Sequence, residues 1–218
     1  MGVRERKERE KQERRRIIVK AAEKIIQVKG VEGMTMDDVA VFAELGKGTI
    51  YLYFKNKVDL FHAVVCRGLR ILLKDIHREV AAPASAMERL VAAGRAYYRF
   101  CLDHPLYFNA MMHMENMDFD FEGRYEMSGV ECCEKVSNEI FALLADLAGE
   151  GVSDGTLQAE MDPRKLSVLL WAQISGVVKM IAGKSDLFEK LWGFSPEEMM
   201  ELQFGLIRRA LVPRSGEA

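Results

Sequence analysis

The sequence has few cysteines and prolines and no long uncharged apolar run. Its 218 residues include 4 cysteines and 5 prolines. The cysteines show no paired spacing, so we expect no disulfide framework, and a reducing compartment fits them best. No stretch of about 18 uncharged apolar residues is present, which argues against a membrane span. The charged N-terminus is not followed by an apolar run, so a signal peptide is not expected either. We therefore expect a cytoplasmic protein.

Motifs of common enzyme and metal sites are missing as well. The sequence has no glycine-rich phosphate loop, no nucleophile elbow and no paired metal-ligand helix motif. Cys101 and His104, with Cys132 and Cys133, have the ligand chemistry of a metal or redox sensor. Adjacent cysteines point to different helix faces, however, and His104 precedes a proline, so this alternative is disfavoured. We expect no catalytic residue, no metal site, no cofactor and no enzymatic activity.

One stretch of the chain, residues 35–57, has the layout of a helix–turn–helix. Thr35 is a typical N-cap residue, and two aspartates follow it in the first turn, where they favour the positive end of a helix dipole. A second short helix, from Lys47 to Phe54, places Ile50 and Phe54 four residues apart on one face. These two side chains should anchor that helix to the core. The helix–turn–helix is predicted at about residues 36–55.

The other face of the second helix carries groups suited to DNA. Lysine, threonine and tyrosine side chains can donate to base edges or phosphates, and a glycine lets the backbone approach the duplex. The free N–H groups after Thr35 can also bind a phosphate. The residues predicted to contact DNA are Thr35, Lys47, Gly48, Thr49, Tyr51, Tyr53 and Lys57. For a single tyrosine, and more for Tyr53 than for Tyr51, core packing with an exposed hydroxyl is the alternative.

At these residues the chain resembles the TetR family of bacterial transcriptional regulators. The resemblance covers roughly residues 14–65 and rests on the run G-K-G-T-I-Y-L-Y-F-K-N-K-V-D-L-F. Glu44 stands where a turn glycine is frequent and must tolerate a positive φ, and Gly46 stands where a serine cap is frequent. The resemblance implies that the matching positions contact DNA. It also implies an inducer pocket in the C-terminal domain.

Charge is distributed unevenly along the chain. The net charge is −2, but residues 1–57 hold 14 Lys and Arg against 9 Asp and Glu, and the remainder is acidic. Residues 2–16 mix basic and acidic groups and end in three consecutive arginines. They form either a solvated, frayed helix extension or an arm whose arginines touch the DNA backbone or a minor groove.

Helical periodicity extends over the rest of the chain, and no convincing strand or repeat is present. Apolar residues recur at spacings of three and four, and capping signals and glycines separate the segments. Helices are expected at residues 17–30, 58–80, 86–101, 106–117, 124–148, from 163 and at 196–211. The predicted fold class is all-α. We expect a three-helix DNA-binding domain at residues 12–72 and a helical-bundle effector-binding and dimerisation domain at 73–218.

The last two long helices carry apolar residues over more than half of their circumference. Val168 and Trp171 lie away from the main apolar stripe of one helix, and Leu202 and Leu206 widen the apolar face of the other. Two such helices from each of two chains would form a four-helix interface. A homodimer would also place two recognition helices on half-sites about one DNA turn apart. The alternative is a thick monomer core.

A group of aromatic residues and methionines suits a pocket for an apolar or aromatic molecule, because methionine adapts to irregular shapes. The same group equally suits an ordinary core. The candidate pocket residues are Tyr97, Phe100, Phe108, Met111, Met112, Met114, Met127, Trp171 and Ile174. Nearby acidic residues could attract a cationic ligand, although a solvated acidic loop is the simpler interpretation; these are Glu115, Asp118, Asp120 and Glu122.

We therefore predict a dimeric, ligand-responsive repressor that binds double-stranded operator DNA. A small apolar or aromatic effector would shift the helix at residues 58–80, change the spacing of the two recognition helices and weaken DNA binding. This requires that the effector binds the DNA-binding and the released arrangement of the dimer with different affinity. The alternative is a helical small-molecule carrier or enzyme with a vestigial DNA-binding domain. The sequence names neither the operator nor the effector.

Overall fold

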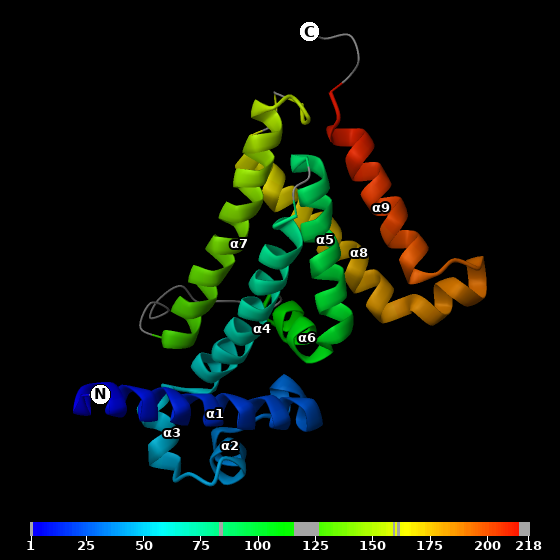
Figure 1. Cartoon of the computed structure of the whole chain (residues 1–218). Helices are drawn as coiled ribbons and strands as arrows, with labels where there is room; N and C mark the ends of the chain where they lie inside the picture. The colour runs from blue at the N-terminus through cyan, green and yellow to red at the C-terminus, as the bar shows by residue number, and fades with distance from the viewer. Residues whose placement is uncertain (1, 83–84, 116–126, 159, 161, 214–218) are drawn as a thin grey trace. The chain divides into compact units, whose positions relative to one another are not determined.

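The computed structural model describes residues 2–82, 85–115, 127–158, 160 and 162–213, with side chains at all of these except 185 and 186. The described residues form α-helices joined by short connections, and no strand occurs among them (Figure 1). The all-α prediction is confirmed. The helices are α1 (Val3–Gly33), α2 (Met36–Phe42), α3 (Lys47–Tyr53), α4 (Lys57–Val80), α5 (Ala86–Asp103), α6 (Pro105–Glu115), α7 (Ser128–Ser153), α8 (Pro163–Trp192) and α9 (Pro196–Leu211).

The chain divides into two compact units. The first comprises Met1–Ile71 and His104–Ser137, and the second comprises Leu72–Asp103 and Asn138–Ala218. Helices α4 and α7 each contribute residues to both units. The first unit therefore contains α1, α2, α3 and α6, whereas α5, α8 and α9 belong to the second.

The core of the first unit is built from apolar residues at helical spacing. Ile18 and Ala22 of α1, Val39 of α2, Ile50 of α3 and Leu60 of α4 have no exposed surface. Spacings of three and four place such residues on one face of each helix, which lets the helices share a core. Among the described residues, this apolar cluster orients α2 and α3.

Helix α1 begins at Val3 rather than at residue 17, so the solvated segment before residue 17 is a helix extension, as one of the two alternatives held. Its first turns consist of Lys, Arg, Glu and Gln, which favour helix, and pairs such as Arg6 with Glu10 add support at i,i+4. The predicted end is confirmed, because Gly30 adopts a positive φ of 72° that interrupts the helix. Val28, which lies three residues after Ile25 and is expected at this spacing to join the apolar face, is 83% exposed.

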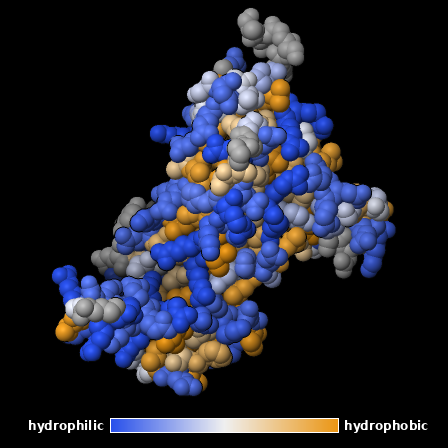
Figure 2. Space-filling view, viewed as in Figure 1, coloured by the Kyte–Doolittle hydropathy of each residue, from blue (hydrophilic) through white to orange (hydrophobic). Residues whose placement is uncertain are grey.

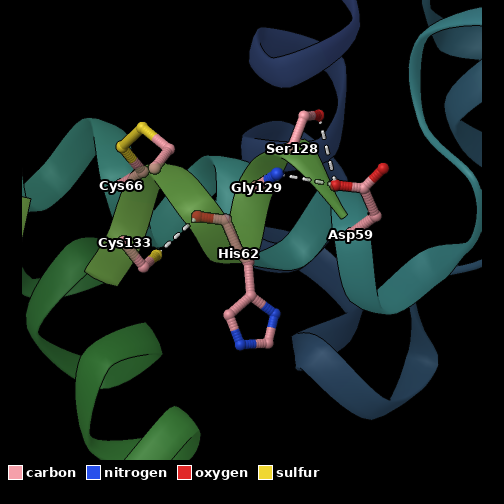
Figure 3. Close-up of a disulfide and its surroundings, with 7 residues drawn as sticks. Asp59, His62, Cys66, Ser128, Gly129 and Cys133 are labelled. Atoms are coloured by element: carbon pink, nitrogen blue, oxygen red, sulfur yellow. Dashed lines mark hydrogen bonds between the residues drawn. A yellow bond between two sulfur atoms is a disulfide. The ribbon is translucent and has the colours of Figure 1, made fainter. Parts of the chain in front are cut away.

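Helices α4 and α7 pack closely in the first unit (Figure 3). The backbone N–H of Gly129 donates to the buried Asp59 carboxylate at 2.7 Å, and the Cys133 thiol donates to the His62 carbonyl at 3.0 Å. Burial raises the pKa of the Cys133 thiol to about 12, so this donor keeps its proton at neutral pH. A side chain at residue 129 would lie 2.1 Å from the Asp59 carbonyl oxygen. Glycine therefore sets the distance between the two helices.

The expectation that the cysteines form no disulfide is wrong for one pair. Cys66 of α4 and Cys132 of α7 are joined by a disulfide, with their Cα atoms 5.8 Å apart (Figure 3). Cys101 and Cys133 remain free and buried. The bonded cysteines lie 66 residues apart and meet only through the packing of two helices. Sequence spacing could not reveal that contact.

The second unit is also held by helix packing and by well-defined helix starts. Ser195 and Glu198 form a capping box at the start of α9, and the Asp162 side chain accepts from two backbone N–H groups at the start of α8. Arg95 of α5 forms an ion pair with Glu201 of α9. Helix α7 does not end at its glycines as expected but continues to Ser153, since packing outweighs a glycine cost of about 1 kcal/mol.

One part of α8 is long and apolar enough to cross a membrane. It comprises Pro163–Lys184, and 33% of its apolar window is buried. Such a segment is weak evidence for a membrane span, because core helices of soluble proteins pass the same test of length and composition. A positive charge, Lys179, interrupts it.

Candidate nucleic-acid interface

The start of α2 is fixed by a capping arrangement. The Thr35 hydroxyl oxygen accepts from the Asp38 backbone N–H at 3.1 Å, and the hydroxyl donates to the Asp38 carboxylate at 2.8 Å. Lys29 of α1 donates to the other oxygen of that carboxylate at 2.7 Å. These hydrogen bonds, led by that from Lys29, lower the pKa of Asp38. The predicted N-cap is confirmed, and α2 is tied to α1.

The turn between α2 and α3 contains both departures from the common family pattern. Glu44 adopts a φ of 54°, the left-handed conformation expected for a residue in the place of a turn glycine. Gly46 is the N-cap of α3 and supplies no side-chain hydrogen bond. Its carbonyl nevertheless accepts from the Thr49 N–H at 2.8 Å. The turn therefore forms without either of the usual residues.

The orientation of α3 follows from its two buried anchors. Ile50 is fully buried and Phe54 is 1% exposed, as the four-residue spacing predicted. The opposite face is open to solvent, with Tyr51 46% and Leu52 82% exposed. Figure 2 shows apolar residues over α2 and α3 beside the hydrophilic surface of α1. The exposed face of α3 thus combines apolar contact area with polar groups.

The structure brings most of the predicted DNA-contacting residues onto this face or beside it. Lys47 and Gly48 are exposed at the start of α3, and Thr49 and Tyr53 are half-buried. Thr35 is exposed at the start of α2. Lys57 lies at the start of α4, where its ammonium donates to the Glu32 carbonyl at 2.7 Å. An ammonium group has three donors, so this contact leaves donor capacity for a phosphate.

The ammonium of Lys47 lies 2.7 Å from the carboxylate of Asp37 on α2. This hydrogen bond raises the pKa of Lys47. Both side chains are largely exposed, so water and salt screen the pair. A phosphate or a guanine edge can therefore compete for Lys47 at small cost. This pairing could not be predicted from the sequence, because the two residues lie on different helices.

Arg15 supports the far end of α3. Its guanidinium lies 4.3 Å from the centre of the Phe54 ring and donates to the Tyr53 carbonyl at 3.3 Å. Partial burial, more than any nearby charge, lowers the pKa of Arg15. Sequence reasoning grouped this residue with its arginine neighbours as one possible DNA arm. In the structure Arg15 instead donates to a backbone carbonyl at the C-terminal end of α3 and packs on the Phe54 ring.

An apolar cavity lies within the second unit. Its volume is about 40 Å³. Tyr97, Trp171 and Ile174 from the predicted pocket line it, as does Ile76 of α4. The Tyr97 and Trp171 rings are 4.7 Å apart, and Tyr97 accepts a hydrogen bond from Ser175 at 3.1 Å. Trp171 therefore faces inward, whereas the sequence had placed it on the outer face of its helix.

The other predicted pocket residues lie elsewhere. Phe100 is buried in the second unit but does not line this cavity. The remaining five belong to the first unit, where three are buried and two are partly exposed; they are Phe108, Met111, Met112, Met114 and Met127. The candidate acidic residues Asp118, Asp120 and Glu122 lie outside the described residues. Residues that the sequence did not single out complete the cavity; they include Leu90, Val91, Leu144 and Phe204.

Exposed apolar side chains are concentrated on α8 and α9. Of the 17 large apolar residues that are exposed in the described chain, 8 lie on these two helices, more than scattered surface exposure would place there. They are Val168, Leu169, Met180, Leu187, Leu191, Trp192, Leu202 and Leu206. The exposure of Val168, Leu202 and Leu206 confirms that the helices are apolar on a second face.

The geometry of α3 suits the major groove of DNA, which admits a single α-helix and offers hydrogen-bonding groups and thymine methyls. Two family models match the chain. The model described as "Bacterial regulatory proteins, tetR family" matches residues 18–64, and the model described as "Tetracyclin repressor-like, C-terminal domain" matches residues 90–204. The second match alone spans more than half of the chain. Both ends of the sequence therefore point to one family.

Similar proteins agree with these matches. The HTH-type transcriptional regulator TtgR of Pseudomonas putida is 28% identical over 181 residues, which cover 78% of this chain and 80% of TtgR. The HTH-type transcriptional repressor BepR of Brucella suis is 24% identical over 169 residues, covering 75% and 78%. The crystal structure of the regulator FadR from Bacillus subtilis in complex with stearoyl-CoA shares the fold, with a TM-score of 0.69, 16% identity and coverage of 88% and 96%. The chain belongs to the TetR family and is a DNA-binding transcriptional regulator.

Proposed function

We propose that the protein is a homodimeric repressor whose α3 helices bind operator DNA and which a small apolar or aromatic effector releases. It acts in the cytoplasm, by binding rather than by catalysis. The observation that carries this proposal is the division of α3 into two faces. Ile50 and Phe54 are buried, while Lys47, Gly48 and Tyr51 are exposed. Exposed aromatic and cationic groups on a short, firmly anchored helix are what major-groove recognition requires.

Each DNA-contacting residue has a distinct role in this proposal. Lys47 leaves Asp37 and donates to a guanine edge or a phosphate, and Gly48 allows close approach of the backbone. Thr49 and Tyr51 contact bases or phosphates with their hydroxyl groups. The remaining three residues hold the duplex by its backbone; they are Thr35, Tyr53 and Lys57.

The dimer forms through the exposed apolar face of α8 and α9. Two helices from each protomer would bury this face in a four-helix interface, which explains why a soluble regulator exposes so many apolar residues there. The DNA-binding domain comprises residues 12–72, and the effector-binding and dimerisation domain comprises residues 73–218. A twofold dimer presents two α3 helices to half-sites about 34 Å apart.

The effector enters the cavity between Tyr97 and Trp171. The present volume of about 40 Å³ holds only a few water molecules, so a larger effector must displace these rings. Ile76 of α4 lines the cavity, and the same helix begins three residues after Phe54, the C-cap of α3. A shift of α4 would therefore reach α3 through the chain itself. Because FadR was crystallised with stearoyl-CoA, acyl-CoA thioesters belong among the effectors to be tested, together with aromatic compounds.

DNA binding is tested with a duplex from the region upstream of the protein's own gene. We expect Lys47→Ala and Tyr51→Ala each to weaken binding by about tenfold or more, since each removes a base or phosphate contact. Lys74→Ala, which removes an exposed lysine from the second unit, is the matched control. Binding of both α3 variants with wild-type affinity would contradict the proposal. A protein that binds effectors but no duplex would favour the carrier alternative.

Release by an effector is tested in two steps. A thermal-shift screen of aromatic compounds and acyl-CoA thioesters should find ligands that raise the melting temperature, because binding to the native state stabilises it. The same ligands should release the duplex in an anisotropy assay. Trp171→Ala should change the effector affinity, whereas Leu102→Ala, at an exposed site, should not. Ligands that stabilise the protein and leave DNA binding unchanged would contradict the proposed release.

A further inference from the structure

The N-terminal turns of α1 carry a row of basic residues on one face. The row comprises Arg4, Lys7, Lys11 and Arg14, whose spacings of three and four place them within about 80° of one another at about 100° per residue. The next residue at this spacing is Ile18, which is fully buried. The face of α1 that packs against the core is thus continued, toward the N-terminus, by four positive charges.

The basic row is exposed, and its charges are not used within the described part of the chain. All four side chains are exposed, and no ion pair joins any of them to another described residue. Glu8 and Glu10 border the row, and the other acidic residues of this segment lie farther from it. Glu8 accepts a hydrogen bond from Gln12 at 2.8 Å. Glu10 pairs with Arg6 at 3.6 Å, and Glu13 pairs with Arg16. The helix therefore neutralises basic residues off the row and leaves the row itself positive.

Contacts farther along α1 show which way the row faces. Arg15, next to the row, touches the end of α3, and Lys29 on the same face pairs with Asp38 of α2. Glu23 lies on a different face and contacts Arg67 of α4 and Tyr107 of α6. The row therefore faces the side of α1 that carries α2 and α3. Figure 1 shows the N-terminal turns of α1 extending along the axis of that helix beyond α3.

We propose that this basic row binds phosphates of the DNA backbone next to the base pairs that α3 contacts. The inference rests on the proposed DNA binding by α3. From Arg4 to Arg14 the row is about 15 Å long at 1.5 Å per residue, enough to follow several phosphates of one strand. Complementary charge and a position beside α3 favour DNA over an acidic protein as the partner. The row adds affinity and sets the extent of the binding site, but it reads no sequence.

The test compares two variants that each lose four positive charges, at different positions of α1. The row variant carries Arg4→Gln, Lys7→Gln, Lys11→Gln and Arg14→Gln. Its matched control carries glutamine at two arginines and two lysines on other faces of α1, all of them exposed; these are Arg6, Arg9, Lys20 and Lys24. Glutamine keeps helix propensity and side-chain length. Circular dichroism and the melting temperature verify that both variants fold like the wild-type protein.

Affinity for the upstream duplex is measured by anisotropy at several salt concentrations, with backbone footprinting beside it. The row variant should bind about tenfold or more weakly, and its slope of log K against log salt should be smaller by about 2–4 per protomer. It should also lose the outermost protected phosphates. The control should change affinity by about threefold or less. Replacement of Arg4 and Arg14 by lysine should preserve wild-type affinity, because phosphate contacts accept either cation.

The outcomes separate this inference from the function on which it rests. If the row variant has the affinity, salt slope and footprint of its control, the inference is overturned. If Lys47→Ala weakens binding at the same time, DNA binding by α3 stands and only the role of the row is wrong. If the wild-type protein binds no duplex, both are overturned.

Discussion

Helices α3 and α8 both expose aromatic or large apolar side chains, but they differ in what accompanies those side chains. On α3, Tyr51 and Leu52 are exposed beside Lys47 and Gly48. On α8, the exposed residues Val168, Leu169 and Met180 lie in the segment long enough to span a membrane, where Lys179 is the only charged residue between Leu166 and Gly183. A DNA groove offers charges and hydrogen-bonding groups together with methyls, whereas a protein interface core offers mainly apolar surface.

The difference teaches that the polar neighbours of an apolar residue indicate its partner. Exposure alone would have placed α3 and α8 in one class. Their anchoring differs too, since α3 is held by Ile50 and Phe54 within only 7 helical residues and has no room for variation in orientation. Helix α8 runs over 30 residues and bends at Lys184. A helix that contacts base edges must hold its position on the DNA to within one base pair. A large apolar surface tolerates a bend such as that at Lys184.

Charging the apolar face of α9 should have the largest effect. Leu202→Glu with Leu206→Glu would bury two unpaired carboxylates in the proposed dimer interface and weaken dimerisation by about 5 kcal/mol or more. Sedimentation should then detect a monomer, and affinity for the upstream duplex should fall as well. Val28→Glu with Leu102→Glu places the same charges at exposed sites of α1 and α5. A charged α9 variant that remains a dimer would show that this face has another partner.

Removing the disulfide should have the next largest effect and should distinguish the two units. Only the first unit has a disulfide among the described residues, and the bond closes a loop of 66 residues. Cys66→Ser with Cys132→Ser should lower the free energy of unfolding by about 4 kcal/mol, because the unfolded chain regains conformational freedom. Urea unfolding with and without a reducing agent measures this loss. The double variant should not respond to reductant, and a wild-type protein that does not respond either would contradict the prediction.

Two glycines of α7 offer a smaller and more local test. Gly129→Ala should destabilise the protein by about 1–3 kcal/mol, because the added methyl would lie 2.1 Å from the Asp59 carbonyl oxygen. Gly149→Ala in the same helix meets its nearest atom at 3.8 Å and should stabilise by about 0.5–1 kcal/mol. Thermal unfolding of both variants measures the contrast. Equal effects would show that α4 and α7 are not held at this distance.

The features that could be predicted from sequence depend on neighbours along the chain. The Thr35 cap, the positive φ of Glu44 and the burial of Ile50 and Phe54 follow from local hydrogen bonding and from helical spacing. The capping box at Ser195 is local in the same way. Such features are determined within a few residues, so the helix–turn–helix and most helix boundaries could be predicted.

The features that were missed depend on contacts between distant segments. The Cys66–Cys132 bond and the inward position of Trp171 against Tyr97 arise only when helices pack. Apolar periodicity predicted that α8 has two apolar faces. It could not predict which of the two packs against α5. For the same reason, aromatic residues and methionines at 97–127 could not be divided between a cavity and an ordinary core.

The smallest effect should come from the ion pair between Asp37 and Lys47. Asp37→Asn should lower the melting temperature only slightly, because water screens the exposed pair and the lost interaction with the α2 dipole contributes about 1 kcal/mol or less. Affinity for the duplex should rise by about fivefold or less, since Lys47 no longer has to leave a partner and one negative charge near the phosphates is gone. Asp75→Asn, on α4 in the second unit, is the matched control. Weaker DNA binding by Asp37→Asn would mean that this carboxylate holds Lys47 in its reading position, and α3 would then depend on α2 for more than its anchoring.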